Sequence, residues 1–297
     1  MASVLSSLRY LLADVIGDDD EPAPSLPENL PAVAAPVVTE AIARLIDYQG
    51  PSYAQLYVDR LKRFVGRPGI DTADLTDIAR LMVMRMAYED PIRIAQLKLA
   101  EHQTAAVAAL ASADGDRKRF RIDELIGALP ALSAEPVLDV LEWAGWTHAP
   151  ISIRYSAASR FGVRRLKIEA GLKRWRLFSI RYAKERVWVA RWLHMIDRAL
   201  TKQPQAAPAI IRTADMIQGY GSLYRHGLAD WHAIIDGLVK PTFDGVLPLA
   251  DLTGAIAEAR AAILPDPRQT ALKRRIAEIR ARALADTAPS SLGRTGS

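Results

Sequence analysis

Apolar residues recur three and four positions apart through most of this chain, a spacing that places them on one face of an α-helix. The clearest example comprises Tyr53, Leu56, Tyr57, Leu61, Phe64 and Val65. An alternating pattern typical of a strand occurs only at residues 151–155, where it indicates a small hairpin or a stretch of extended chain. Because strand patterns do not alternate with helices, we expect no doubly wound parallel sheet. The sequence predicts a mainly α protein with at most a short β-hairpin.

Helix start and stop signals give approximate bounds for the other elements. Residues 74–88 form a predicted helix with inward-facing Leu75, Ile78, Met82 and Met86. The next helix is expected to begin with Asp90 as N-cap and Pro91 at the first helical position, and to end before Gly115. Another helix begins near residue 133 and ends at Gly145. Later helices are predicted at residues 157–175, 181–201, 206–218, 227–239, 249–264 and 267–285.

Composition divides the chain into three segments. Residues 1–36 form an N-terminal segment and an acidic, Pro-rich linker, since five prolines disfavour both helix and central strand: Pro22, Pro24, Pro27, Pro31 and Pro36. Residues 37–285 form the predicted helical domain. Residues 286–297, rich in Ser, Thr, Gly and Pro, are expected to be a disordered tail.

The residue inventory limits the chemistry that this chain can perform. None of the 297 residues is cysteine, which excludes disulfides, a thiolate nucleophile and a cysteine-ligated zinc ion or iron–sulfur cluster. The five histidines lack the spacing of metal ligands, so we predict neither a metal site nor catalytic residues. No apolar run reaches the length of a membrane span, and the N-terminus lacks the basic start of a signal peptide. We therefore expect a cytoplasmic protein.

Positive charge is concentrated between residues 154 and 191. This stretch holds twelve Lys and Arg residues against Glu169 and Glu185, a net charge of +10, whereas the whole chain carries +5. Four interpretations remain open: a solvated helix face, a protein interface, a site for a small anionic ligand, or a nucleic-acid surface. The candidate residues for an anion or partner surface are Arg164, Arg165, Lys173, Arg174, Arg176, Arg181, Tyr220 and Arg225.

Two local features have simpler structural interpretations. Trp188 and Trp192 lie one helical turn apart and are expected in the core. The segment 219–227 contains three glycines that could cradle a phosphate, but its spacing matches no phosphate-binding motif. We therefore expect Gly219 to be a helix C-cap and the other two glycines to allow a tight turn.

Several ordered motifs resemble the C-terminal region of indolepyruvate ferredoxin oxidoreductase. The stretch Leu45–Leu61 is similar to the family signature (L/V)xDYQxxxYAxLYxxR, and Met86–Asp90 followed by Ile94–Leu97 resembles its MAYxD and VAxL helices. Residues 171–186 are similar to a later basic segment, and Ile217–Gly221 to a turn with the sequence (I/V)KGYG. The resemblance covers residues 38–262.

Complete members of this 2-oxoacid:ferredoxin oxidoreductase family oxidatively decarboxylate aryl pyruvates to acyl-CoA with thiamine diphosphate and iron–sulfur clusters. This chain has no cysteine for a cluster and no thiamine motif. The resemblance implies a subunit or domain without cofactors, partnered by a cofactor-bearing oxidoreductase subunit or a Rossmann-like γ-type domain. The alternative is a stand-alone helical module that binds nucleic acid or another polyanion through residues 154–191.

Overall fold

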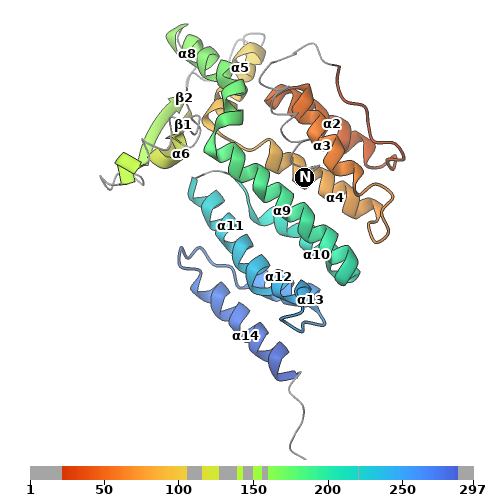
Figure 1. The fold of residues 1–297 in the computed structure, drawn as a ribbon. Coiled ribbons are helices and arrows are strands. Elements are labelled where there is room, and N and C mark those ends of the chain that lie inside the picture. Colours follow the sequence, from red (N-terminus) through yellow and green to blue (C-terminus); the bar gives the residue numbers. More distant parts are fainter. Residues whose placement is uncertain are drawn as a thin grey trace, which may run out of the picture. The chain divides into compact units, whose positions relative to one another are not determined.

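The computed structural model describes residues 22–105, 116–126, 139–142, 150–155, 160–219 and 221–286. This part of the chain is mainly α-helical, as predicted, with one two-stranded sheet (Figure 1). No helix within these ranges is long and apolar enough to cross a membrane. The chain divides into two compact units, residues 1–190 with 219–221, and residues 191–218 with 222–297. The predicted tail beyond residue 286 and residues 1–21 of the N-terminal segment lie outside the described residues, so the three-segment division stays a prediction.

The first unit contains a core of packed helices. Its elements are α2 (Ala35–Tyr48), α3 (Pro51–Lys62), α4 (Thr72–Met86), α5 (Pro91–Ala105), α6 (Ile122–Ile126), α8 (Arg160–Gly171), the 3₁₀ helix η1 (Leu172–Phe178) and residues 180–190 of α9 (Ile180–Lys202). The predicted inward residues of α3 and α4 are buried, among them Tyr57, Leu61, Ile78 and Met82. The apolar spacing in the sequence therefore identified the correct helix faces.

Local hydrogen bonds explain where the helices of this unit begin. The Asp71 side chain accepts from the Asp74 backbone N–H at 2.7 Å and caps α4. The Asp90 side chain likewise accepts from the Arg93 N–H at 2.6 Å, with Pro91 at the first position of α5. The Asp90 contact confirms the predicted N-cap of α5. The Asp71 contact shows that α4 begins at Thr72, slightly before the predicted start at residue 74.

The sheet pairs β1 (Asp116–Arg121) with β2 (Pro150–Tyr155) in antiparallel register, Lys118 opposite Ile153. β2 lies where the sequence shows the strand-like pattern, at residues 151–155, but it pairs with the distant β1 and does not form a small local hairpin. β1 was not predicted, because its sequence DRKRFR has one apolar residue and no alternation. Beside the sheet, Leu166 of α8 packs with Ile94 and Ala95 of α5.

The second unit is wholly helical in its described residues. It contains residues 191–202 of α9, η2 (Pro204–Ala206), α10 (Ala207–Arg212), η3 (Thr213–Met216), nearly all of α11 (Gly221–Ile234), the π-helix η4 (Ile235–Val239), α12 (Lys240–Phe243), α13 (Leu252–Ala261) and α14 (Thr270–Asp286). Two buried indoles anchor its core: the Trp192 N–H donates to the Ile210 carbonyl at 3.3 Å, and the Trp231 N–H donates to the Thr213 hydroxyl at 3.0 Å.

The glycine-rich segment differs in part from the prediction. Gly219 has a φ of +63°, the left-handed conformation expected near a helix C-terminus, although η3 already ends at Met216. The helix predicted to begin at residue 227 begins at Gly221, so Gly221 and Gly227 are helical and do not form a turn. A Cβ at Gly227 would lie 2.1 Å from the Met216 carbonyl oxygen, so the close approach of two backbone segments explains this glycine.

Candidate functional site

The most extensive polar network in the described part of the chain surrounds Arg176, in the 3₁₀ helix between α8 and α9. This helix ends at Phe178. The next residue, Ser179, has an extended backbone that interrupts the helical path, and its hydroxyl accepts from the Tyr182 N–H at 3.1 Å at the start of α9. The short, tightly wound segment turns Arg176 into the first unit, where the side chain is only 1% exposed. Its three partners in the network are Tyr48 at the end of α2, Gln49 at the α2–α3 junction and Asp90 just before α5.

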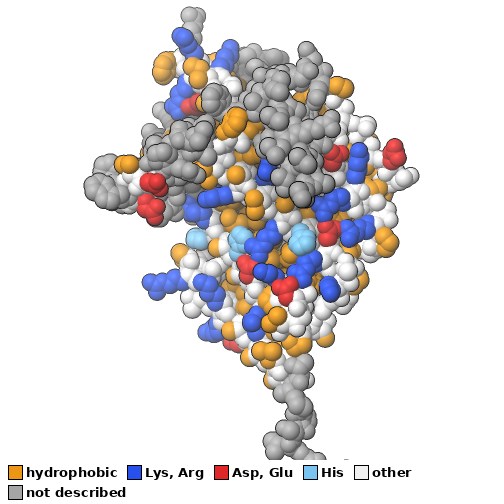
Figure 2. Space-filling model, in the orientation of Figure 1, with side chains coloured by type: hydrophobic (Ala, Val, Ile, Leu, Met, Phe, Trp, Pro, Cys, Tyr) orange, Lys and Arg blue, Asp and Glu red, His pale blue; other side chains and the backbone are white. Residues whose placement is uncertain are grey.

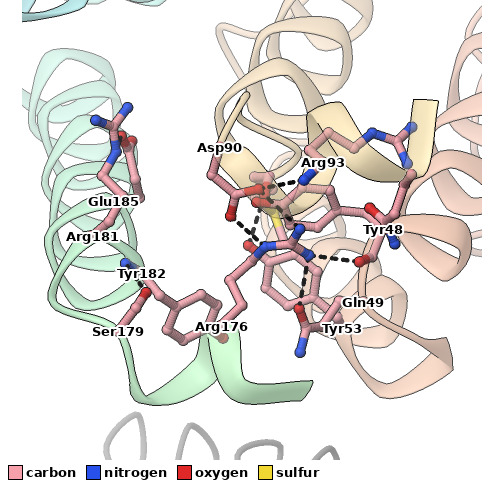
Figure 3. A network of polar contacts seen from close by, with 12 residues as sticks. Tyr48, Gln49, Tyr53, Asp90, Arg93, Arg176, Ser179, Arg181, Tyr182 and Glu185 are labelled. Carbon is pink, nitrogen blue, oxygen red and sulfur yellow. Dashed lines mark hydrogen bonds and ion pairs between the residues drawn. The ribbon is translucent and has the colours of Figure 1, made fainter. Parts of the chain in front are cut away.

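Arg176 makes a forked ion pair with the cap of α5 (Figure 3). Its Nε donates to Asp90 Oδ2 at 2.6 Å and its Nη2 to Asp90 Oδ1 at 3.1 Å. Its Nη1 donates to the Tyr48 carbonyl at 2.7 Å and the Gln49 side-chain oxygen at 3.3 Å. The guanidinium also lies 3.8 Å from the centre of the Tyr48 ring. One side chain thus joins the end of α2 to the start of α5.

The charges of this pair are compatible with burial because each has hydrogen-bond partners. Burial alone would lower the pKa of Arg176, but interactions with Tyr48 and Asp90 outweigh it and raise the pKa above its usual value. Asp90 also retains its bond to the Arg93 N–H, and Arg93 pairs with Asp47 of α2. The network therefore holds fixed, mutually compensated charges.

Four tyrosines pack around this ion pair. The Tyr48 ring stacks on Tyr53 at 6.1 Å and meets Tyr88 edge-on at 5.8 Å, while Tyr53 lies 5.8 Å from Tyr182. Burial raises the pKa of Tyr48, Tyr53 and Tyr88, so these phenols stay protonated at neutral pH. Tyr53 donates to the Met86 carbonyl at 3.0 Å. None of these three phenols is suited to act as a general base.

A second buried carboxylate, Glu185 of α9, lies beside the tyrosines. Its Oε2 accepts from Arg85 Nη2 at 2.5 Å, and its Oε1 lies 2.8 Å from Arg181 Nε. The two guanidiniums also contact aromatic faces, Arg85 on Trp188 at 5.3 Å and Arg181 on Tyr88 at 5.2 Å. Trp188 is buried, as predicted. Two cations thus share one carboxylate, which gives this cluster a net positive charge.

The structure does not gather the predicted surface residues into one patch. The expectation of a surface position is wrong for Arg176, because Asp90 and Tyr48 hold this side chain inside the unit. Arg181 is largely enclosed against Glu185. Arg164 and Arg165 are exposed on α8, where Arg165 pairs with Glu169 at 2.7 Å. Lys173 and Arg225 are half-buried, and the Arg174 side chain and all of Tyr220 lie outside the described residues.

Charges of both signs are mixed on the visible surface as well. On the face that Figure 2 shows, several Lys and Arg side chains stand beside Asp and Glu side chains. Examples from the ion pairs of the second unit are Arg198 with Asp244 at 2.8 Å and Arg275 with Glu278 at 2.9 Å. Within residues 154–191, four cations are likewise paired with carboxylates: Arg165, Arg176, Arg181 and Arg191. Summed sequence charge therefore overstates how much of the basic segment is available to a ligand.

The partners of the buried cations were missed by sequence reasoning. Asp90 was predicted as a helix cap but not as the counter-ion of Arg176, which is 86 positions away. Glu185 was counted only as a minor negative charge within the basic segment. The available signal was the position of Tyr48, Gln49 and Asp90 inside the resemblance motifs, since residue types that recur in a motif often serve one structural site.

A smaller cluster in the second unit contains a histidine. Arg191 Nη1 lies 3.0 Å from His232 Nδ1, Arg191 also pairs with Asp236, and its guanidinium lies 5.5 Å from the Trp231 ring centre. In this arrangement the neutral imidazole accepts from the arginine through Nδ1. Across the described ranges, no group of three or more His, Asp or Glu side chains is placed to hold a metal ion.

His232 should make the stability of the protein depend on pH. Burial and the adjacent Arg191 lower the pKa of His232, and Asp236 only partly opposes them. The folded state therefore binds fewer protons than the unfolded state, so stability should fall as the pH drops below about 6.5, the usual histidine pKa.

Chemical denaturation between pH 5.5 and 8 measures how the free energy of unfolding changes with pH. This change should be smaller for His232→Gln than for the unmodified protein. Replacement of exposed His194 by Gln is the control and should leave the change with pH as it is in the unmodified protein. An equal change with pH for His232→Gln and the unmodified protein would contradict the role given to His232.

The fold and network define an α-helical domain organised around buried arginine–carboxylate pairs. A family model described as "Family of unknown function (DUF6537)" matches residues 34–237, more than half of the chain. The chain belongs to this family. Comparisons with curated proteins and with solved structures give no significant match.

Proposed function

We propose that this chain is a subunit or domain without cofactors in an indolepyruvate-type 2-oxoacid:ferredoxin oxidoreductase. The whole complex would convert aryl pyruvates oxidatively to acyl-CoA. Thiamine diphosphate and iron–sulfur clusters would reside on its partners, a cofactor-bearing subunit or a Rossmann-like γ-type domain. The observation that carries this proposal is the convergence of three separate resemblance motifs on the Arg176 network.

Each motif supplies a different part of that network. The first provides the Tyr48 carbonyl and the Gln49 side chain, the second provides Asp90, and the third provides Arg176. These contacts join residues that are 86 to 128 positions apart. Short motifs distributed along the chain are expected when their residues must satisfy one another inside a buried polar site. The geometry thus gives a physical reason for the order and spacing of the resemblance.

The chemistry of the network favours a structural role over a catalytic one. Asp90 and Glu185 are engaged by arginines, and the phenols of Tyr48, Tyr53 and Tyr88 stay protonated. A general base or nucleophile needs a group whose reactive form is populated and accessible. We therefore infer that the contribution of this chain to catalysis is made by association with a cofactor-bearing partner.

Helix α8 presents a surface suited to that association. Phe161 is 79% exposed and Ile168 62% exposed, and they lie two helical turns apart on the face opposite buried Leu166. Exposed Arg164 lies beside this pair, and exposed Lys167 extends the basic edge. An apolar stripe with basic flanks is complementary to a partner surface that has an apolar centre and acidic edges. We call this stripe, Phe161, Arg164, Lys167 and Ile168, the α8 surface.

Loss of the apolar stripe should strongly weaken association without unfolding the protein. The double variant Phe161→Ser, Ile168→Ser is expected to bind the thiamine- and cluster-bearing subunits of the same genome about tenfold or more weakly, because a few side chains that become buried in an interface carry most of its binding energy. Sedimentation velocity of the mixed proteins at low ionic strength measures this. The matched control is Val33→Ser, Val246→Ser, which removes two exposed valines elsewhere. If the unmodified chain does not associate with those subunits, the docking proposal fails.

Binding of a polyanion is the alternative function, favoured by the exposed cations Arg164 and Lys167. It predicts a complex with a single-stranded or double-stranded oligonucleotide, whose affinity falls with salt along a log–log slope that reflects several phosphates. Such a complex, formed without affinity for the oxidoreductase subunits, would replace the first proposal with this one.

A further inference from the structure

Arg60 is the last residue of the first resemblance motif, and the Arg176 network does not use it. It lies in α3 two helical turns after Tyr53, and its side chain is half-buried. The neighbouring carboxylate, Asp59, accepts from Gln55 at 2.8 Å and lies 3.7 Å from the Lys62 ammonium. Among the described residues, Arg60 has no carboxylate partner. It is thus a partly buried cation whose counter-charge the described chain does not supply.

Further cations approach Arg60. The groups that act on it electrostatically are Tyr53, Tyr182, Arg186 and Arg63. The Tyr53 and Tyr182 rings, 5.8 Å apart, connect α3 with α9, and Arg186 follows Tyr182 by one helical turn. Burial, with the added charges of Arg186 and Arg63, lowers the pKa of Arg60, while the two tyrosines oppose this effect. Like charges are therefore collected where α3 meets α9.

Three other enclosed arginines of this unit each have the carboxylate partner that Arg60 lacks in the described part of the chain. Arg176 is paired with Asp90, Arg85 with Glu185, and Arg93 with Asp47. A partly buried guanidinium without such a partner loses hydration and gains no ion pair, which is costly. Arg186 is also half-buried, and it forms no ion pair with a carboxylate in the part of the chain that the structure describes. Two neighbouring guanidiniums in this state are suited to an oxyanion, since the planar fork of arginine matches phosphate and carboxylate oxygens.

We propose that Arg60 and Arg186 form a binding site for the oxyanion group of a small ligand, a phosphate or a carboxylate. Arg63, whose guanidinium lies 5.5 Å from the Phe64 ring centre, contributes positive potential to the site. Arg60 and Arg186 each keep part of their residue surface exposed to solvent. The site lies within the first unit and needs no partner protein, so it stands independently of the oxidoreductase proposal.

Ligand-induced thermal stabilisation of the full chain tests this site. Inorganic phosphate, pyrophosphate and acetate are titrated separately at constant ionic strength, with chloride as the balancing anion. A ligand that binds only the folded state raises Tm in a saturable manner. We expect saturable stabilisation by phosphate or pyrophosphate if the ligand group is a phosphate, and by acetate if it is a carboxylate.

Two variants that each remove one positive charge test whether the oxyanion binds at Arg60 and Arg186. Arg60→Gln and Arg186→Gln are each expected to weaken oxyanion binding about tenfold or more, because each removes charge-assisted hydrogen bonds. Exposed Arg44→Gln in α2 makes the same change in net charge and should retain the affinity of the unmodified protein. If Arg60→Gln does not fold, Arg186→Gln decides the result. The proposal is overturned if no oxyanion stabilises the protein beyond chloride, or if Arg44→Gln weakens binding as much as the two site variants.

Discussion

Replacement of Arg176 by methionine is expected to lower the free energy of unfolding by about 3 to 5 kcal/mol, the usual effect of removing one partner from a buried ion pair. Methionine fills much of the same volume, so the loss comes mainly from Asp90, which keeps its charge inside the protein without the fork that compensates it. The Tyr48 carbonyl and the Gln49 side chain lose a donor at the same time. Urea denaturation followed by circular dichroism measures the change.

A double-mutant cycle separates this ion pair from general disruption. Asp90→Asn removes the negative charge but retains a side chain that can cap α5. The double variant Arg176→Met, Asp90→Asn should therefore be more stable than the sum of the single losses predicts. Arg176→Lys keeps the charge without the fork and should give an intermediate loss. Additive single losses, or a loss below about 1 kcal/mol for Arg176→Met, would show that the pair does not hold this unit together.

Gly227→Ala should destabilise the second unit by about 3 kcal/mol, the upper part of the usual range for overpacking. Glycine to alanine within a helix normally stabilises by about 1 kcal/mol, so the expected sign is reversed. The cause is the Met216 carbonyl, which a Cβ at residue 227 would approach to 2.1 Å. Because both groups in this contact belong to backbone segments, α11 or the end of η3 must move.

Gly237→Ala is the matched control for this prediction. A Cβ there would lie 2.8 Å from Ile276 Cγ2, a side-chain methyl group that can shift more readily than a backbone carbonyl. We therefore expect a smaller loss than at Gly227, measured by the same denaturation experiment. A gain in stability for Gly227→Ala, or equal effects at the two positions, would contradict the close backbone approach.

The features predictable from the sequence were those set by local interactions. The Asp90 cap depends on a neighbour three residues away, and the burial of Trp188 and Trp192 follows from their one-turn spacing on a helix. Strand β1 was missed because its own residues do not alternate between apolar and polar. It is a strand because it pairs with β2, which is distant in the sequence. The early start of α11 was missed because glycine normally disfavours a helix, whereas at Gly227 tertiary contact requires it.

The candidate site was less predictable because charge alone does not reveal where a side chain points. Arg176 has the same sequence context as exposed Arg164, a basic segment with interleaved aromatics. Their different environments arise from the 3₁₀ helix and from Asp90, which is distant in the sequence. Arg60 differs from Arg176, because it is half-buried without a carboxylate partner among the described residues. Nothing in its local sequence indicates this.

The central claim is that this chain acts in oxoacid oxidation by joining cofactor-bearing subunits, and reconstitution of electron transfer tests it most directly. Indolepyruvate- and CoA-dependent reduction of ferredoxin should be measured for the thiamine- and cluster-bearing subunits of the same genome, with and without the purified chain. We predict that the chain alone gives no turnover, that its addition raises the rate of the subunits, and that the variant with serine at positions 161 and 168 does not. A rate that is indifferent to the chain at every concentration would contradict the account.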